Sequence, residues 1–449
     1  MQMETRTRWT LVWLLFVGGA ISYLDRAALS ITAPLITKEL NLDPAQLGIV
    51  FSSFFVGYAL FCFVGGYSAD RFGPKRVLTV SMLVWSLFCG LTAATVGIAS
   101  LLVVRVIFGM GEGPFCANIN KLVSNWFPRR QQASAIGIAN SGQSLGAALA
   151  GPVVGFIAVS AGWRMSFVII SAVGVLWVVA WLMLARDKPS VEPDAHEERA
   201  AAPGVQRTQQ AAMSGATRAA VRTVRETPVP YTLHSAHTAT PLREYLLRPA
   251  ILATAFAFFG YAYILYFFLS WFPTYLTTAH HLSIQKMAVV SVIPWAVGAS
   301  GLIVGGLVCD WLFRKTGRAI FARKVVLIAS LGAGAVCIAL TGTVTELTSA
   351  VTLMAIGVFF MYASYNTYFA IVLDTVEKDR VGAIGGFVHF IANLAGIVAP
   401  ALTGFLVQWS GNFRSAFLLT GAIALAGALL VALCVHAPKR QVQFEPGIA

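Results

Sequence analysis

Long apolar stretches recur along the whole chain and are separated by shorter polar segments. Each stretch is long enough to cross a hydrocarbon layer of roughly 30 Å, which takes about 20 helical residues. Because the bilayer core offers no water to the backbone, each stretch is expected to be a helix. We predict twelve spans, at residues 10–36, 46–69, 77–97, 100–124, 132–159, 165–186, 249–277, 287–309, 323–343, 347–375, 382–408 and 413–436.

The first span does not have the form of a cleavable signal peptide. It is too long, it carries charges at its centre, and it lacks a small-residue cleavage site. We therefore count it among the membrane helices.

The composition agrees with a membrane protein. Of 449 residues, 57% are hydrophobic and 11% are charged, and the mean hydropathy is +0.74. Soluble domains carry about 25% charged residues. The net charge of +13 would suit a nucleic-acid partner, but most Lys and Arg residues lie in the termini and in alternate loops. Such alternation is a topology signal, so we expect cytoplasmic termini and no nucleic-acid partner.

One segment, residues 187–248, breaks the apolar pattern. It is rich in Ala, Pro, Arg and Thr and poor in aromatic residues, which predicts a largely disordered cytoplasmic linker. It separates an N-terminal six-helix bundle at 1–186 from a C-terminal six-helix bundle at 249–436, and residues 437–449 form a cytoplasmic tail. The predicted fold class is an all-α integral membrane protein with 12 transmembrane helices in two six-helix bundles.

The two halves repeat each other. "GGYSADRFGPKR" from Gly65 follows the second span, and "GGLVCDWLFRKTG" from Gly305 follows the eighth. "WRMSF" and "FRSAF" open the sixth and twelfth spans, and "QSLG" and "NLAG" lie in the fifth and eleventh. Three matches in the same order indicate a duplicated bundle. Transporters built from such repeats hold substrate near the membrane midplane, between the halves.

These motifs give the chain a resemblance to the major facilitator superfamily over nearly its full length. The loop after the second span matches the superfamily's Gly-x-x-x-Asp-Arg-x-Gly-x-Lys/Arg-Arg signature, with Pro74 at one usually basic position. Within the superfamily, "YLDRAALS" in the first span and "SNWFP" followed by basic residues resemble the anion:cation symporter family. That family includes bacterial carriers of galactonate, glucarate and hexuronates.

Four ionisable residues lie deep inside the predicted spans: Asp25, Arg26, Arg105 and Glu112. Charges at this depth are costly, and in membrane proteins they usually mark a substrate or ion pathway. An arginine keeps its charge and presents a planar fork that fits a carboxylate, so Arg26 and Arg105 suit an anionic substrate. A buried carboxylate can take up and release a proton near neutral pH, so Asp25 and Glu112 suit proton coupling. The structural alternative is two buried salt bridges that only hold helices together.

The resemblance implies the same division of roles. Arg26 falls where sugar-acid carriers contact the substrate carboxylate, and Asp25 and Glu112 fall on the family's protonation positions. Those carriers have a tryptophan near the position of Tyr368, and this departure leaves the exact substrate open. Further substrate-binding candidates, matching polar positions of the cavity or clustered in the tenth span, are Tyr23, Tyr58, Gln143, Ser364, Asn366, Tyr368 and Asn393.

The remaining polar residues receive structural interpretations. We predict that the two loop signatures latch helices in one conformational state through Asp70, Arg71, Asp310 and Arg314. His389 is interpreted as structural, with a proton relay as the alternative. The six cysteines form no CxxC pair, and the sequence offers no metal site, no cofactor motif and no nucleophile with a paired base. We therefore expect neither an enzyme nor a bound metal or cofactor.

The sequence thus predicts a secondary active transporter that takes up a small organic anion together with protons by alternating access. The expected substrate is a sugar acid (an aldonate, aldarate or hexuronate), and the expected location is the bacterial inner membrane, as a monomer. The alternatives are an aromatic or other carboxylate as substrate, sodium coupling, anion exchange, and a sensor that has lost transport. Exchange needs no titrating carboxylate, so Asp25 and Glu112 disfavour it.

Overall fold

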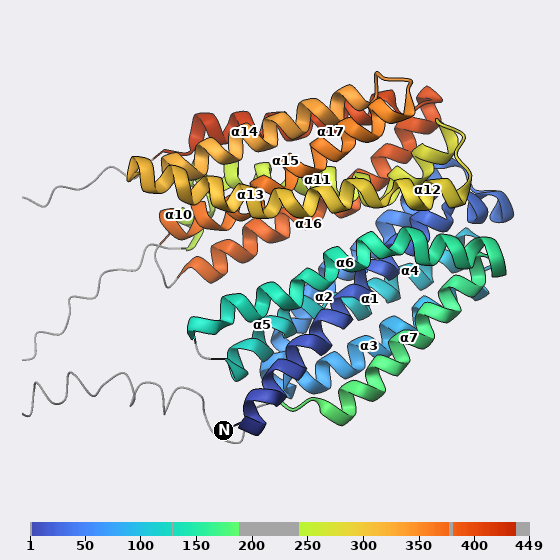
Figure 1. The fold of residues 1–449 in the computed structure, drawn as a ribbon, viewed down its shortest axis with the longest axis horizontal. Coiled ribbons are helices and arrows are strands. Elements are labelled where there is room, and N and C mark those ends of the chain that lie inside the picture. The colour runs from blue at the N-terminus through green and yellow to red at the C-terminus, as the bar shows by residue number, and fades with distance from the viewer. Residues whose placement is uncertain (1, 128, 188–241, 377–379, 437–449) are drawn as a thin grey trace, which may run out of the picture.

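The computed structural model describes residues 2–127, 129–187, 242–376 and 380–436, and these are helical apart from short turns (Figure 1). Within these ranges, twelve helical segments are long and apolar enough to cross a membrane, which confirms the predicted number of spans. Of the predicted linker at 187–248, only its first residue and last seven fall within the described ranges. The first five of those seven residues form the short helix α10.

The helical elements follow one another with few intervening residues, except between α7 and α10. They are α1 (Gln2–Leu40), α2 (Pro44–Phe72), α3 (Pro74–Leu91), the 3-10 turn η1 (Thr92–Ala94), α4 (Ile98–Glu112), α5 (Phe115–Trp126), α6 (Arg129–Ala161), α7 (Trp163–Leu184), α10 (Leu242–Leu246), α11 (Pro249–Thr278), α12 (Ile284–Val290), α13 (Val292–Thr316), α14 (Ala319–Thr341), α15 (Leu347–Thr375), α16 (Val381–Ser410) and α17 (Arg414–Cys434).

Two of the predicted spans are interrupted. The fourth span is divided into α4 and α5 at Gly113 and Pro114. A proline lacks the backbone N–H that would continue the helix and clashes with the preceding turn. The eighth span is divided into α12 and α13 at Ser291. The first of these breaks directly follows the buried Glu112, so it helps to set the position of that side chain.

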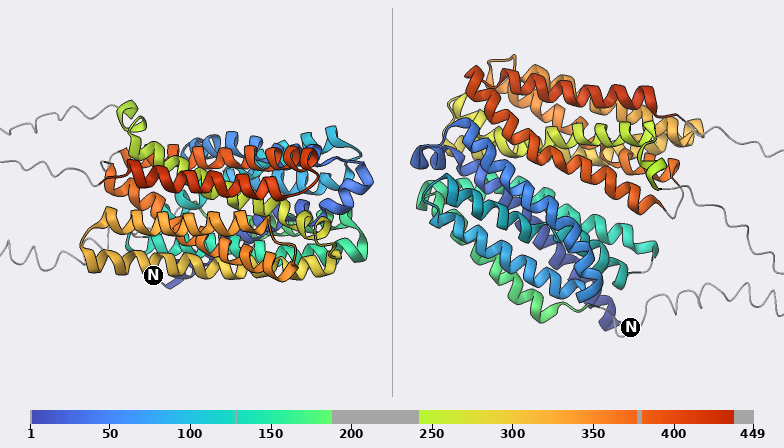
Figure 2. Two further views of the ribbon diagram at one scale, coloured as in Figure 1. Left: turned by 90° about the horizontal axis from the view of Figure 1, so that it is seen from above. Right: turned by 180° about the vertical axis from the view of Figure 1, so that it is seen from behind.

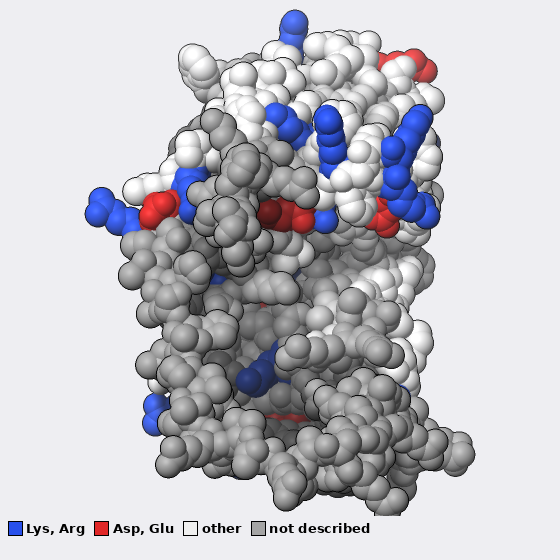
Figure 3. Space-filling view, turned by 90° about the vertical axis from the view of Figure 1, so that its left-hand side faces the viewer, with Lys and Arg blue, Asp and Glu red and all other residues white. Residues whose placement is uncertain are grey.

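The helices lie in two groups that meet at one end and diverge at the other. Figures 1 and 2 show α1 to α7 on one side and α11 to α17 on the other, with the N-terminus at the diverging end. Figure 3 looks at that end and shows several Lys and Arg side chains exposed on it.

At the opposite end the groups are joined by direct contacts. The Ser52 hydroxyl of α2 donates to the Ile397 carbonyl of α16 at 2.6 Å and accepts from the Ala401 N–H at 3.0 Å. A Cβ atom at Gly48 would lie 2.6 Å from the Pro400 carbonyl oxygen, so only glycine allows this close approach of α2 to α16.

Candidate functional site

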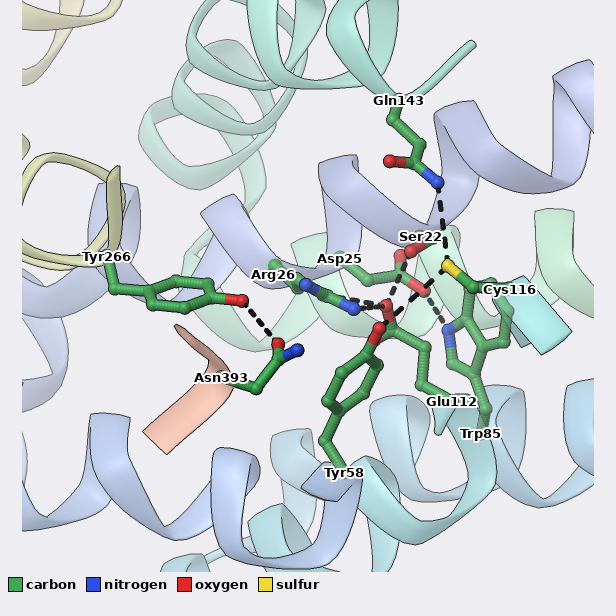
Figure 4. Close-up of polar contacts among 10 residues, drawn as sticks. All are labelled: Ser22, Asp25, Arg26, Tyr58, Trp85, Glu112, Cys116, Gln143, Tyr266 and Asn393. Atoms are coloured by element: carbon green, nitrogen blue, oxygen red, sulfur yellow. Dashed lines mark hydrogen bonds and ion pairs between the residues drawn. The ribbon is translucent and has the colours of Figure 1, made fainter. Parts of the chain in front are cut away.

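Arg26, on α1, lies at the centre of the buried polar residues and is bound to Glu112 at the end of α4 (Figure 4). Its Nε and Nη2 atoms both donate to Glu112 Oε1, at 2.6 and 2.5 Å. The Ser22 hydroxyl donates to the same oxygen at 2.5 Å. Arg26 is 7% exposed and Glu112 is 0% exposed. Three donors therefore converge on one carboxylate oxygen, and Glu112 Oε2 has no hydrogen-bond partner among the described residues.

The second carboxylate, Asp25, shows the same asymmetry. The indole Nε1 of Trp85, on α3, donates to Asp25 Oδ2, whereas Oδ1 has no partner in the part of the chain that the structure describes. Asp25 is only 2% exposed. A buried acceptor without a partner is costly, and native structures keep such atoms mainly where they have a function. A proton on the free oxygen would remove the charge and leave the existing hydrogen bonds in place.

Arg105 has no carboxylate partner among the described residues. It is 3% exposed, its guanidinium lies 5.0 Å from the ring centres of both Phe54 and Phe108, and its Nε is unbonded. Within the described ranges it forms no ion pair with Asp25 or Glu112. The structural alternative of two buried salt bridges is therefore realised for one pair only.

A small pocket of about 10 Å³, room for about one water molecule, adjoins both arginines. Phe51, Phe54 and Phe55 of α2 line it on one side, and Leu269 and Ser270 of α11 line it on the other. Two buried cations thus face space that is shared by the two helix groups.

Aromatic rings surround the Arg26 guanidinium. Its Cζ atom lies 4.5 Å from the ring centre of Tyr58 and 5.1 Å from that of Tyr23. Such contacts stabilise a cation through the negative faces of the rings. The Tyr58 hydroxyl is 3.9 Å from the Cys116 sulfur, to which the Gln143 amide donates at 3.8 Å. Three of the predicted binding residues therefore gather around Arg26, as Figure 4 shows for Tyr58 and Gln143.

The C-terminal group contributes Asn393 to the same region. Its Oδ1 accepts a hydrogen bond from the Tyr266 hydroxyl at 2.9 Å, and its Nδ2 donates to the His389 carbonyl at 2.9 Å. The Tyr266 ring lies 4.4 Å from the Phe55 ring across the boundary between the groups. In Figure 4, Arg26 lies between this Tyr266–Asn393 pair and Glu112.

The candidates on α15 do not share one environment. Ser364 and Tyr368 are fully buried and hydrogen-bonded to each other at 3.0 Å. Asn366 is exposed and lies beside Gly306 of α13. Residues two apart lie on widely separated faces of a helix, so Ser364 and Asn366 point in different directions. The structure does not bring Asn366 to the Arg26 cluster.

The described residues cover the predicted latches only in part. Asp310 and Arg314 form no ion pair or hydrogen bond with any described residue, and the Asp70 side chain lies outside what the structure describes. Arg71 lies over the ring of its neighbour Phe72. On the C-terminal side, Arg323 of α14 instead pairs with Asp374 of α15.

Four residues of the cluster are not among the sequence predictions: Ser22, Trp85, Cys116 and Tyr266. Ser22 could have been proposed because it precedes Arg26 by one helical turn and so shares its face. Trp85 and Tyr266 lie in spans with many aromatic residues, and nothing local separates them from packing residues. Cys116 is the second residue of α5, just after the break between α4 and α5, which the sequence prediction places inside a continuous span.

Buried charges on two neighbouring helices, polar groups from both halves and twelve membrane-spanning helices define a multi-pass membrane transporter. The model of the Major Facilitator Superfamily matches residues 15–393 and, in a second match, 319–448. The chain belongs to this superfamily, and the expected resemblance is confirmed. Members of the superfamily are transporters, so a carrier rather than an enzyme is also confirmed.

Individual relatives cover nearly the whole chain. A hexuronate transporter of Bacillus subtilis (strain 168) is 45% identical over 431 residues, covering 96% of this chain and 95% of its own. A probable sulfoacetate transporter of Cupriavidus necator is 31% identical over 430 residues, and the match covers 96% of this chain and 94% of that protein.

A crystal structure shares the fold at low identity. It is a bacterial homolog of the human lysosomal transporter Spinster, in an inward-facing and occupied conformation, with a TM-score of 0.74 and 17% identity. The match covers 95% of this chain and 96% of that chain.

Proposed function

We propose that this protein takes up a sugar acid, foremost a hexuronate, together with protons. The observation that carries the proposal is the Arg26–Glu112 pair, in which a cation suited to a substrate carboxylate is occupied by a carboxylate that can be protonated. The hexuronate transporter at 45% identity supports the substrate class.

The proposed architecture is two six-helix bundles, at 1–186 and 249–436, with cytoplasmic termini and a cytoplasmic linker at 187–248. In this orientation the diverging end faces the cytoplasm, and the structure corresponds to an inward-facing state. The protein acts as a monomer in the bacterial inner membrane. Ser52 and Gly48 then belong to the closed external gate between α2 and α16.

The proposed coupling follows from competition for Arg26. When Glu112 is charged, it holds two of the guanidinium N–H groups, and an incoming carboxylate must displace it. A proton on the unpartnered Oε2 neutralises Glu112 and frees Arg26 for the substrate. Linkage then requires reciprocity: protons raise substrate affinity, and bound substrate raises proton affinity by the same coupling free energy. Asp25, next to Arg26, is proposed as the second protonation site.

The remaining polar groups suit the hydroxyl-bearing part of a sugar acid. Tyr58 and Gln143 belong to the N-terminal helix group, and Tyr266 and Asn393 belong to the C-terminal helix group. Hydroxyl groups both donate and accept hydrogen bonds, so they can engage the phenols and amides that flank the arginine. Binding across both groups would let one substrate draw them together, as alternating access requires. Arg105 would stabilise a second negative charge, such as that of an aldarate.

The test is uptake by purified protein in liposomes. Glucuronate and galacturonate should accumulate when the lumen is alkaline, and a sodium gradient without a pH gradient should drive no accumulation. Uptake of gluconate and glucarate in the same assay shows how the rate depends on the length and charge of the substrate. Accumulation driven by a sodium gradient would refute the proposal. So would a lack of accumulation of every sugar acid tested by protein that is still folded.

A second candidate substrate is a short sulfonated carboxylate. It is favoured by the relative described as a probable sulfoacetate transporter and by the two buried arginines, which could hold one anionic group each. Sulfoacetate should then compete with glucuronate for uptake. Failure to compete, even at a large excess, would remove this candidate.

A further inference from the structure

A groove on the N-terminal group lies outside the proposed substrate site. It runs between α2, α3 and α4 and has a volume of about 540 Å³. Its walls are almost entirely apolar and include Phe61, Val64, Phe72, Val80 and Ile107. Val80 is 61% exposed, and Val64 and Phe72 are also exposed, so the groove opens outward on helices that cross the membrane. Its surroundings are therefore lipid rather than water.

Residues at the break between α4 and α5 form the bottom of the groove. A Cβ at Gly65 of α2 would lie 2.4 Å from the Pro114 Cα atom, so α2 touches the break directly. Gly111, one residue before Glu112, packs against the backbone of Trp85 in the same way. Small residues thus close the groove from behind, while its large apolar residues form the sides.

One end of the groove is basic. Arg76, near the start of α3, lines it there, is exposed, and forms no ion pair or hydrogen bond with the described residues. Arg71 lies over the ring of Phe72 at the same end. The neighbouring Lys75 is occupied instead, because its ammonium group donates to the Leu182 carbonyl at 3.2 Å. Arg76 is therefore an exposed cation at the mouth of an apolar groove.

The length of the groove fits one lipid leaflet. Arg76 and Val84 mark its extent along α3. Eight residues of helix span roughly 12 Å at 1.5 Å per residue, and half of the hydrocarbon core is about 15 Å thick. A groove of this length and volume admits an extended chain rather than a helix, whose diameter is about 10 Å.

We propose that this groove binds an anionic phospholipid, with one acyl chain between α2, α3 and α4 and the phosphate on Arg76. A guanidinium pairs with phosphate through parallel hydrogen bonds, and basic pockets beside membrane helices favour anionic headgroups. The bound chain lies against Pro114 and Gly111, which flank Glu112. Lipid occupancy therefore stabilises the α4–α5 break. This site is independent of the identity of the transported anion.

The test is lipid binding to the full-length protein in detergent, followed by native mass spectrometry and thermal unfolding. Phosphatidylglycerol and phosphatidylcholine with the same chains are compared, together with glycerol 3-phosphate, which lacks the chain. We expect phosphatidylglycerol to bind more tightly and to raise the Tm most, and glycerol 3-phosphate to do neither. Equal binding of the two lipids, or an equal effect of glycerol 3-phosphate, would overturn the proposal.

Variants locate the site. Arg76→Gln should weaken phosphatidylglycerol binding about fivefold and abolish the preference over phosphatidylcholine. Arg318→Gln, which removes an exposed cation at the start of α14, should change neither. Val80→Trp should fill the groove and weaken both lipids, and Val64→Phe repeats this test from the opposite wall. Unchanged lipid binding in Arg76→Gln, or in a folded groove-filling variant, would contradict the assignment.

Discussion

Glu112→Gln separates substrate binding from proton coupling. The substitution keeps the size and shape of the side chain but removes its charge and its ability to titrate. In the structure, Glu112 accepts two hydrogen bonds from Arg26 and one from Ser22 through a single oxygen, and the Gln carbonyl can accept the same bonds. The variant therefore imitates the protonated carrier at every pH.

The magnitude follows from the two bonds to Arg26. A hydrogen bond that involves a charged group contributes about 1.5–3 kcal/mol. With both groups charged it lies near the upper end of this range, and with Arg26 alone charged it lies near the lower end. Each bond thus weakens by about 1 kcal/mol, and the pair weakens by about 2 kcal/mol. A substrate carboxylate then has to displace a pair that is about 2 kcal/mol weaker. The substrate Kd of the variant should therefore be about 30-fold lower than that of the wild type at alkaline pH. Once the proposed proton is bound to Glu112 in the wild type, the two proteins should bind substrate equally.

The assay pairs equilibrium binding at several pH values with two transport modes in liposomes. Glu112→Gln should bind glucuronate with an affinity that no longer rises towards acidic pH, and it should support counterflow exchange. It should not accumulate substrate when driven by a pH gradient. Glu346→Gln, at an exposed carboxylate before α15, is the matched control and should behave as wild type. Full pH-driven accumulation by Glu112→Gln would refute the reasoning.

Three further predictions test the site, the gate and the topology. Arg26→Lys keeps the charge but loses the planar fork, so glucuronate affinity should fall at least about tenfold; an unchanged Kd in folded protein would remove Arg26 from the site. Gly48→Leu should hold α2 away from Pro400 and stop transport, and cysteines introduced at the external gate should become reactive to thiol reagents. The control Gly332→Leu, where no atom lies within 4 Å of the added Cβ, should transport normally. A cysteine at Gln209 should resist an impermeant thiol reagent added to intact cells, whereas labelling from outside would contradict the cytoplasmic linker.

The twelve helices could be predicted because membrane insertion depends on a local property. A run of apolar residues carries its own signal, whatever its neighbours are. The break at Pro114 was not predicted, since prolines inside membrane helices are often tolerated. Pro34, Pro152, Pro273 and Pro400 all lie within continuous helices of this structure. Sequence alone does not distinguish Pro114 from them.

The charged part of the site was also accessible from the sequence. Asp25, Arg26, Arg105 and Glu112 stand out because a charge inside an apolar span is rare. Their pairing was not accessible, since it depends on how α1, α3 and α4 pack. From the sequence, Asp25 and Glu112 are equally suitable partners for the arginines. In the packed structure Arg26 pairs with Glu112, and Trp85 donates a hydrogen bond to Asp25.

Neutral polar residues were the least predictable part. Tyr and Asn occur both in packing interfaces and in binding sites, and their direction depends on the face of the helix that meets the cavity. Tyr266 was missed although it bonds to the predicted Asn393, and Asn366 was included although it lies beside Gly306. A resemblance in the pattern of a span does not fix which of its faces meets the cavity.

The most direct test of proton coupling is to measure proton movement that is driven by the substrate alone. Liposomes containing the protein and a pH-sensitive dye in the lumen are prepared in sodium-free buffer with equal pH on both sides, and glucuronate is added outside. The account predicts that the lumen acidifies as glucuronate enters, and that neither protein-free liposomes nor Glu112→Gln liposomes acidify. Entry of glucuronate into wild-type liposomes without a change in lumenal pH would contradict it.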